Sequence, residues 1–294
     1  MQQRVSIATP SSFSFRHTVN SHGWSDLLPF EVDPELNELI VSLDLGNNVV
    51  TARITHSGGR LKIKLTEPVA QTEQVRKTVA HIFRLDEPLD EFYILTAADP
   101  ELMWVSGCGA GRLLRSSTVW EDLVKTLCTT NCSWSLTRIM VTNIVNELGP
   151  AGSDGRRAFP SAEMMADKDE AFYRDVIRAG YRAPYLHELA NSVACGKLKP
   201  DEFLDPQVPS AELRANIKKI KGFGDYATDN LLKLLGRYDG LALDSWLRSR
   251  FYEKRNNGRR CPDKKIERHY KKYGDWKGLA IWCDMTEDWF AEPE

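Results

Sequence analysis

Residues 220–230 read Ile-Lys-Gly-Phe-Gly-Asp-Tyr-Ala-Thr-Asp-Asn, and this stretch decides how the chain folds. Apolar residues at helical spacing predict a helix over Ser210–Lys219 before it and a second helix over 225–235 after it. Gly222 and Gly224 let the backbone N–H groups at the start of the second helix point outward together, which suits an anion such as phosphate. A glycine turn that only joins two packed helices is the plainer alternative for these residues alone. A dinucleotide-binding loop is excluded, because no strand precedes the glycines and that motif's third glycine is missing.

An acid follows the second helix after a short apolar run. Leu241, Ala242 and Leu243 lead directly to Asp244, and a basic segment with helical spacing begins after it. Aspartate is a good N-cap, so Asp244 has a structural interpretation as the first residue of a helix. A capping aspartate is also rigid and kept ionised by the N–H groups that it accepts, so the cap is compatible with a chemical role.

Positive charge is concentrated in one segment near the C-terminus. Residues 247–277 contain twelve Lys or Arg and four Asp or Glu, a net charge of +8 in a chain whose net charge is -2. A basic stretch in an otherwise acidic chain indicates a one-sided contact with a polyanion. A solvated, charged helix explains the same composition equally well.

The first part of the chain is predicted to be β-rich and to serve as a scaffold. Strands are expected at Glu38–Leu45, Asn48–Ile54 and Arg60–Leu65, with a hairpin turn at Gly58-Gly59 and a helix over Gln71–Ile82.

From about residue 117 the pattern becomes helical. Thr118 and Glu121 have capping-box spacing, and two helices are expected to meet at a polar corner, 131–133, before Gly149-Pro150 ends the second. Further helices are predicted over Ser161–Ala166, Lys168–Ala179 and Ala183–Ala194.

The composition is that of an ordinary globular protein of 294 residues. No apolar run approaches the roughly 20 residues of a membrane span, and no secretory signal is recognised at the N-terminus. The six cysteines form no CxxC pair and the six histidines no HExxH motif, so no metal site is expected. We expect an intracellular protein, in the cytoplasm and nucleoid of a bacterium or in the nucleus of a eukaryote.

The hairpin and the aspartate that follows it resemble the helix-hairpin-helix (HhH-GPD) DNA glycosylase superfamily. Ile220–Gly224 matches the hairpin and Leu241–Asp244 matches the loop that ends in an aspartate. The chain departs from the pattern where Lys221 replaces a frequent proline and where no proline precedes Asp244. Further family-like segments are Gly109–Leu113, Phe159–Ser161, Gly180–Ala183 and Gly274–Trp276, and the resemblance covers about 105–290.

The resemblance is closest to the alkylpurine branch (3-methyladenine DNA glycosylase II), with some likeness to 8-oxoguanine DNA glycosylase. It implies an α+β protein with a β-containing N-terminal domain, followed by an all-α helix-hairpin-helix glycosylase core of two helical lobes. We place the N-terminal domain at 1–105 and the core at 106–294, with the hairpin at 210–235.

The resemblance also implies the chemistry. Glycosylases flip a damaged nucleotide out of the duplex, and an ionised carboxylate, here Asp244, stabilises the positive charge that develops on the sugar. Bifunctional members use a lysine two residues after the second glycine. That position is Tyr226, which cannot form an imine, so no lyase activity is expected. An aromatic ring there can stack on a cationic base, although core packing of Tyr226 is an open alternative.

The predicted site residues fall into three groups. Trp134 is expected to fill the core, and Trp246 is assigned equally to the pocket and to packing. The catalytic residue is Asp244; the base pocket comprises Tyr226, Trp246, Asn131 and Arg182; the DNA-binding residues are Lys221, Gly222, Phe223, Gly224, Asp225, Arg248 and Arg250.

The predicted function is that of a monofunctional glycosylase that excises an alkylated purine from duplex DNA and leaves an abasic site for base excision repair. An enzyme for oxidised or deaminated purines such as 8-oxoguanine is the first alternative, and a non-catalytic protein that binds damaged DNA is the second. The expected partner is double-stranded DNA with a damaged base, without a membrane, and the protein is expected to be a monomer. No cofactor is required, and a monovalent cation at the hairpin is implied by resemblance only.

Overall fold

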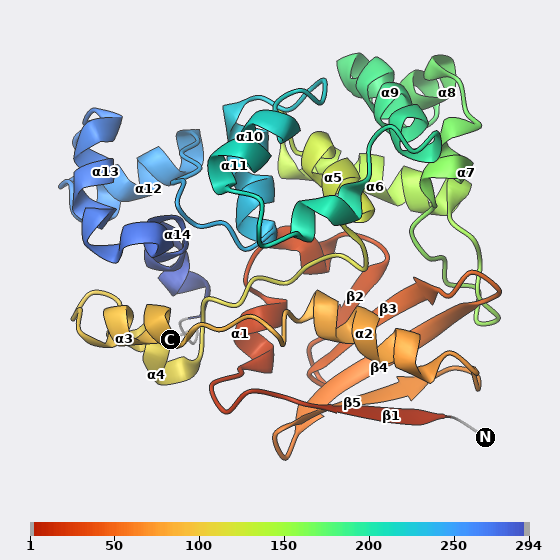
Figure 1. Cartoon of the computed structure of the whole chain (residues 1–294), viewed down its shortest axis with the longest axis horizontal. Helices are drawn as coiled ribbons and strands as arrows, with labels where there is room; N and C mark the ends of the chain where they lie inside the picture. Colours follow the sequence, from red (N-terminus) through yellow and green to blue (C-terminus); the bar gives the residue numbers. More distant parts are fainter. Residues whose placement is uncertain (1–2, 291–294) are drawn as a thin grey trace.

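The computed structural model describes residues 3–290, and its N-terminal part is built on one antiparallel sheet (Figure 1). The five strands lie in the order β1-β5-β4-β3-β2, so both edge strands come from segments for which no strand was predicted. The strands are β1 (Arg4–Ala8), β2 (Phe30–Asp33), β3 (Glu38–Asp44), β4 (Val49–Ser57) and β5 (Arg60–Leu65).

The three predicted strands are confirmed as the centre of this sheet. β4 and β5 pair from Ser57 opposite Arg60, which leaves Gly58-Gly59 as a two-residue turn. Both glycines have positive φ, +58° and +66°, as the turn that matches the twist of a hairpin requires. The edge strands β1 and β2 are five and four residues long, too short for a clear alternation in sequence.

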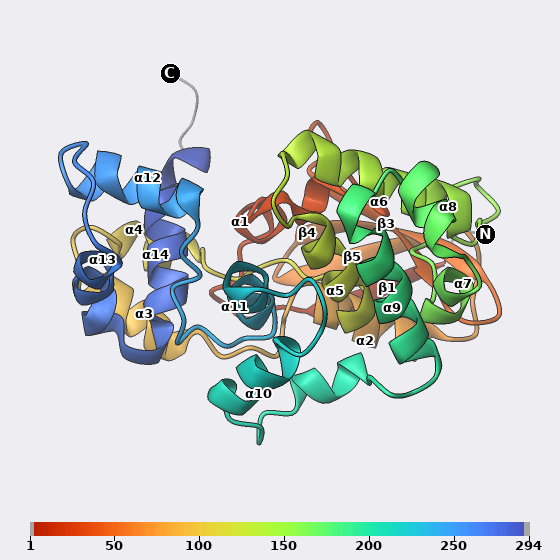
Figure 2. The same cartoon turned by 90° about the horizontal axis from the view of Figure 1, so that it is seen from above.

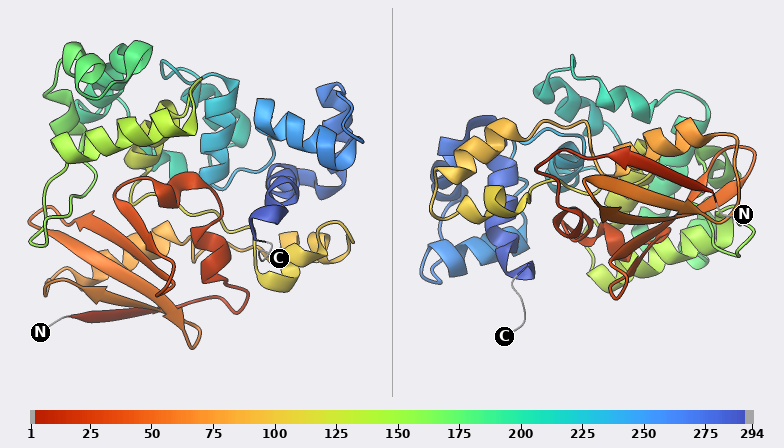
Figure 3. Two further views of the ribbon diagram at one scale, coloured as in Figure 1. Left: turned by 180° about the vertical axis from the view of Figure 1, so that it is seen from behind. Right: turned by 90° about the horizontal axis from the view of Figure 1, so that it is seen from below.

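Helices α1 (Phe15–Val19) and α2 (Thr72–Ile82) complete the core around the sheet. Helix α2 lies across one face of the sheet and buries Val75 and Val79, at helical spacing, toward it (Figures 1 and 3). Phe83, just after α2, stacks on Phe15 of α1 with ring centroids 5.4 Å apart. The predicted helix 71–82 is therefore confirmed.

A second group of helices surrounds α5 (Val119–Cys128), all ten of whose residues are buried. Thr118 caps its N-terminus by accepting from the Glu121 N–H, as the capping-box spacing predicted. The group also contains α6 (Trp134–Leu148), α7 (Ala162–Ala166), α8 (Glu170–Asp175) and α9 (Ala183–Ala194), with the short turns η2 (Gly180–Arg182) and η3 (Pro200–Leu204).

The corner between α5 and α6 lies where it was predicted, but α8 is shorter than predicted. Asn131 turns the corner with a φ of +46°, and Ser133 caps α6. Asp169 caps α8 through the Phe172 N–H, 2.8 Å away, so the helix cannot begin at Lys168. Arg178 has a φ of +66°, which is incompatible with the predicted extension to Ala179.

A third group of helices unites two distant parts of the sequence, and we call it the C-terminal helix cluster. Figures 1 and 2 show the helices of residues 90–108 lying beside those of residues 245–289. Phe92 stacks on Trp276 at 5.5 Å, so residues 90–105, assigned by sequence to the N-terminal domain, pack against C-terminal helices. The cluster comprises α3 (Asp90–Ala97), α4 (Met103–Cys108), α12 (Ser245–Arg255), α13 (Asp263–Tyr270), η4 (Lys271–Trp276), α14 (Lys277–Thr286) and η5 (Glu287–Trp289).

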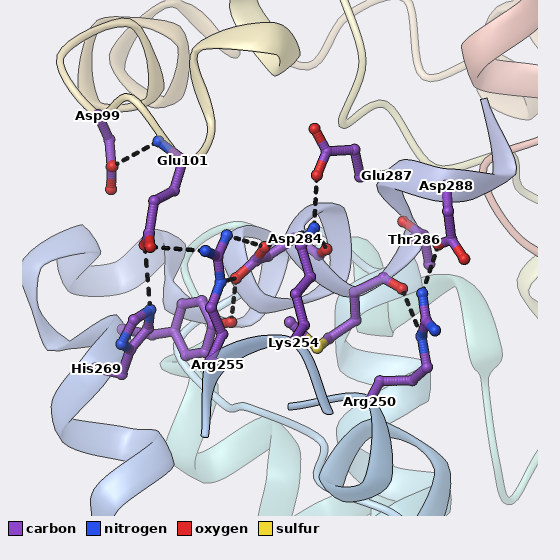
Figure 4. A network of polar contacts seen from close by, with 12 residues as sticks. Asp99, Glu101, Arg250, Lys254, Arg255, His269, Asp284, Thr286, Glu287 and Asp288 are labelled. Atoms are coloured by element: carbon purple, nitrogen blue, oxygen red, sulfur yellow. Dashed lines mark hydrogen bonds and ion pairs between the residues drawn. The ribbon is translucent and has the colours of Figure 1, made fainter. Parts of the chain in front are cut away.

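A polar network centred on Asp284 holds this cluster together (Figure 4). The buried Asp284 carboxylate accepts from Arg255 and Tyr270, each at 2.5 Å, and lies 3.1 Å from the Lys254 ammonium. Arg255 also binds Glu101, between α3 and α4, at 2.6 Å. Burial opposes ionisation of Asp284, but its hydrogen bonds with Arg255 and Tyr270 outweigh burial and lower its pKa.

Within residues 3–290, no helix is long and apolar enough to cross a membrane. The same residues contain no group of three or more His, Cys, Asp or Glu side chains placed to hold a metal ion.

Candidate active site

The predicted hairpin joins α10 (Ser210–Ile217) to α11 (Asp225–Leu234) through its two glycines. Gly222 has a φ of +90°, and a Cβ there would lie 2.5 Å from Leu127 Cδ1 of the central helix α5. Both the backbone conformation and the packing therefore require glycine at 222. Gly224 is the N-cap of α11, and a Cβ there would meet open space, so the N-terminus of α11 is open to solvent.

Charged residues around the hairpin already have partners within the chain. Asp225 binds Arg214 at 2.7 Å and Lys218 at 2.9 Å, and these hydrogen bonds, that with Lys218 first, lower its pKa. Lys221 binds Glu188 at 2.6 Å. The Phe223 side chain is buried, so of this predicted DNA-contact residue only the backbone faces outward.

Asp244 is the N-cap of α12, as its sequence position suggested. Its Oδ1 accepts from the Leu247 N–H at 2.7 Å, and Ala242, two residues earlier, has a φ of +50°, which turns the loop toward the helix. The carboxylate is half-buried and lies on the wall of a pocket of about 950 Å³. The cap fixes one oxygen, which leaves the other available to the pocket.

The pocket is assembled from four distant parts of the chain, which no local motif reveals. The N-terminal segment before and within η1 (Gly23–Asp26) contributes one wall, and α5 and the corner before α6 contribute another. Further lining residues come from α11, from the chain around Asp244, from α14 and from residues 289–290. The main lining residues are His22, Trp24, Thr129, Cys132, Trp134, Tyr226, Asn230, Lys233, Asp244, Trp246, Trp282, Trp289 and Phe290.

Three tryptophans form an aromatic wall. Trp246, Trp282 and Trp289 contact one another pairwise, with ring centroids 5.7–5.9 Å apart. Trp246, for which packing and pocket were equally expected, lies in the pocket wall. Trp134 also lines the pocket and is 38% exposed, so its predicted place in the core is wrong. It begins α6 at the polar corner, where its ring lies against Gly23 of η1.

Tyr226 and Lys233 face the pocket from the same side of α11. They are seven residues apart, two helical turns, so their side chains lie on one face of the helix. Burial and then the nearby Asp244 carboxylate raise the pKa of the Tyr226 phenol. The Lys233 ammonium lies 4.5 Å from the centre of the Trp282 ring. No sequence pattern predicted that Lys233 would reach the pocket.

His22 brings a neutral imidazole to the pocket. Its Nε2 donates to the Leu114 carbonyl at 2.7 Å, and burial lowers its pKa to about 4. Trp24 beside it donates from Nε1 to Asp122 at 2.7 Å, which fixes the ring. The sequence contains no signal for these two residues, because they reach the pocket through the packing of the N-terminal part on α5.

Asn131 and Arg182, predicted for the base pocket, do not line it. Arg182 is buried, donates from Nε to Thr130 Oγ1 at 3.2 Å and lies 4.4 Å from the Tyr181 ring centre. Its charge therefore stabilises the α5–α6 corner from inside. Asn131 is exposed at that corner, where its Nδ2 lies 3.4 Å from the Tyr181 hydroxyl.

The predicted DNA contacts on α12 are also paired within the chain. Arg248 forms a bidentate pair with Asp263, both bonds 2.9 Å, and Arg250 binds Asp288 at 2.6 Å (Figure 4 shows Arg250). Exposed basic side chains without an ion pair to the described residues are found in the next loop and in α13: Arg259, Arg260, Lys264 and Arg268.

Comparisons with known proteins relate the fold to solved structures. No family model and no curated protein matches the sequence. A 3-methyladenine DNA glycosylase from Archaeoglobus fulgidus is similar with a TM-score of 0.78 and 17% identity, over 97% of this chain and 98% of that one. An 8-oxoguanine glycosylase/lyase from Clostridium acetobutylicum is similar with a TM-score of 0.75 and 17% identity, over 97% of both chains. At these identities the likeness establishes the fold, which is that of the helix-hairpin-helix DNA glycosylases of both branches.

Proposed function

We propose that this chain is a DNA glycosylase that excises a damaged purine from duplex DNA by means of Asp244. The observation that carries the proposal is the position of this carboxylate, fixed by the Leu247 N–H on the wall of a largely aromatic pocket of about 950 Å³. A pocket of this size accommodates a flipped purine nucleotide, and its aromatic wall offers faces for stacking. The similar solved structures are named as DNA glycosylases, which supports the same reaction class.

The chemistry follows from what Asp244 can do. When the bond from C1′ to the base breaks, the base takes the electron pair and positive charge develops on the sugar. The Asp244 oxygen that does not cap α12 stabilises this charge and orients the attacking water. Because the cap holds the side chain before substrate arrives, little reorganisation is required in the transition state.

We further propose that DNA lies between two helical lobes. One comprises α5–α11 and the other is the C-terminal helix cluster, and the pocket receives side chains from both. The open N-terminus of α11, at Gly224, would bind a phosphate through backbone N–H groups. The Asp225 carboxylate at this hairpin is already bound to Arg214 and Lys218, so a monovalent cation would have to rely on backbone oxygens, and no step depends on it.

The proposed reaction ends at an abasic site without strand cleavage. Tyr226 occupies the position of the nucleophilic lysine and carries no amine. The nearest pocket amine, Lys233, has its Nζ buried from solvent two turns farther along α11. Neither residue presents a free amine to C1′.

Two classes of damaged purine fit different parts of the pocket. The tryptophan wall and Tyr226 suit an alkylated purine, the class expected from the sequence. The buried ammonium of Lys233 favours an oxidised or deaminated purine, which is uncharged and carries an extra carbonyl. A non-catalytic damage-binding protein would need Asp244 only as the N-cap of α12, a role that does not require the carboxylate to line the pocket.

The proposal is tested with duplexes that each contain one lesion: an alkylated purine, 8-oxoguanine, hypoxanthine or uracil. Cleavage seen only after hot alkali, and reduced at least ~100-fold in Asp244→Asn, is the expected result. Asparagine still caps a helix, so the variant should fold. Nicking without alkali would contradict the absence of lyase activity, and tight binding with no excision of any lesion would contradict the enzyme itself.

A further inference from the structure

Lys233 is a buried ammonium without a counter-ion. The residue is 3% exposed, and its Nζ has no hydrogen-bond acceptor and no carboxylate within 4 Å among residues 3–290. The Nζ instead makes a cation–π contact with the face of the Trp282 ring, 4.5 Å from the ring centre. An isolated buried charge is costly, so its presence in a pocket wall points to a role in what the pocket accepts.

The helix determines which part of a flipped nucleotide meets this charge. Asp244 and Tyr226 line the same pocket, and Tyr226 belongs to the first turn of α11, next to the hairpin. Lys233 lies two turns, about 10 Å, farther along the axis. With the sugar at Asp244 and its phosphate at the hairpin, the base extends toward Lys233 and the tryptophan wall.

In the described part of the chain, no group around Lys233 pairs directly with its ammonium, and the Asp244 carboxylate acts on it without a hydrogen bond. Burial lowers its pKa to about 8, against the opposing influence of Asp244, Asp229 and Cys283, so the amine is mostly protonated at pH 7. Asp229 is already bound to Arg214 at 2.8 Å. In the same pocket His22 is neutral, since its pKa is about 4, and burial keeps the Cys283 thiol protonated by raising its pKa.

We infer that Lys233 makes the pocket select uncharged purine lesions over positively charged N-alkylated purines. A cationic base such as 7-methylguanine would enter the field of the ammonium and find the face of Trp282 already occupied by a cation. An uncharged base stacks on the remaining aromatic surface without repulsion, and a carbonyl oxygen directed toward Lys233 is attracted. The favoured class includes hypoxanthine and 8-oxoguanine as well as uncharged alkylated purines such as 1,N6-ethenoadenine. The inference rests on the proposed glycosylase function and deepens it.

The test compares single-turnover excision of 7-methylguanine with that of hypoxanthine and 1,N6-ethenoadenine. Lys233→Met removes the charge at similar volume, and Lys233→Arg keeps it. Lys62→Met, which removes an exposed charge from β5, is the matched control. Removal of this charge should raise the ratio of charged to uncharged excision by ~10- to 100-fold in Lys233→Met. The ratio should stay within about twofold of wild type in the other two variants. An unchanged ratio in Lys233→Met, with excision still lost in Asp244→Asn, would overturn the inference and leave the proposed function intact.

A pH profile separates charge selection from a merely structural role. Between pH 7 and 9 the ratio of charged to uncharged excision should rise in the wild type as Lys233 loses its proton. In Lys233→Arg, which stays charged, this rise should be absent. Titration of the lesion itself is common to both proteins and cancels in the comparison. A profile shared by the two proteins would count against the inference.

Binding measured without excision keeps this test independent of catalysis. Fluorescence anisotropy of Asp244→Asn with the intact lesion duplexes should give tighter binding of the uncharged lesions, and this preference should vanish in the double variant with Lys233→Met. That result would support the inference even if no lesion is excised, in which case the proposed function alone fails. Equal affinities for charged and uncharged lesions would overturn the inference.

Discussion

At the scale of single residues, the site combines a carboxylate that has a hydrogen-bond partner with an ammonium that has none among the described residues. Asp244 is held by the hydrogen bond that caps α12, so the group proposed for catalysis also stabilises this helix. Lys233 has no such partner and destabilises the fold wherever it is charged. Because a buried, unpaired charge lowers stability, the free energy of unfolding reports whether Lys233 is charged in the folded protein.

We predict that Lys233→Met increases the free energy of unfolding. The folded-state pKa of Lys233 is lowered to about 8, so the folded protein binds fewer protons than the unfolded chain between about pH 8 and pH 10.5. The penalty of roughly 3 kcal/mol is therefore fully present below pH 8 and disappears as the pH rises to about 10.5. Urea titrations of both proteins at pH 7 and pH 10 would check this, since the advantage of Lys233→Met should shrink at the higher pH. A constant difference would mean that the pKa of Lys233 is the same in the folded protein and in the unfolded chain.

At the scale of elements, the sequence was informative where a local rule applied. The central strands, the α5–α6 corner, the hairpin and the cap at Asp244 were predicted because turn glycines and N-caps act within a few residues. The edge strands β1 and β2 were missed because each is short and depends on its neighbour for pairing. Arg182 was misassigned to the base pocket because its charge is satisfied by a carbonyl group brought near by packing, which spacing does not reveal.

The hairpin gives a prediction that separates its two glycines. Gly222→Ala places a Cβ 2.5 Å from Leu127 Cδ1 at a φ of +90°, so we expect a loss of about 2–4 kcal/mol in the free energy of unfolding. Gly224→Ala meets open space at a φ of -77°, and it should cost at most about 1 kcal/mol as a poorer N-cap. Chemical denaturation of the two variants would measure the difference. Equal losses would mean that the Gly222 turn relaxes without disturbing α5.

At the scale of the whole molecule, the pocket and the C-terminal helix cluster both depend on segments far apart in the sequence. His22 and Trp24 meet Tyr226 and Trp282 in one pocket, and α3–α4 pack on α12–α14. The residues of a segment indicate whether it forms a helix or a strand, but not which other segments it packs against. For this reason the sequence predicted Asp244 and the hairpin but neither the tryptophan wall as a unit nor the place of Lys233.

The polar network of the cluster predicts an acid-induced loss of stability. Asp99 binds Lys272 and Tyr273, which outweigh burial and lower its pKa to about 2, and the pKa of Asp284 is lowered as well. Carboxylates with lowered folded-state pKa values stabilise the protein above about pH 4 and lose that contribution as the pH falls toward 2. We expect the melting temperature to fall steeply in this interval, and the fluorescence of Trp246, Trp282 and Trp289 should report the loss. In Asp284→Asn the fall should be smaller, from a lower starting value, because one of the titrating groups is gone.

The union of α3–α4 with the last helices also constrains how the protein is made. Tyr273 donates to Asp99 across a sequence separation of 174 residues, and Arg255 reaches Glu101 across 154. During synthesis, α3 and α4 leave the ribosome long before the helices that cover them, so their apolar faces stay exposed until α12–α14 have been made. The sheet and α2, whose contacts are formed by the first 83 residues, can fold early. Cotranslational folding should therefore occur in two stages, with the tryptophan wall and Asp244 assembled only in the second, so that a nascent chain acquires its site last.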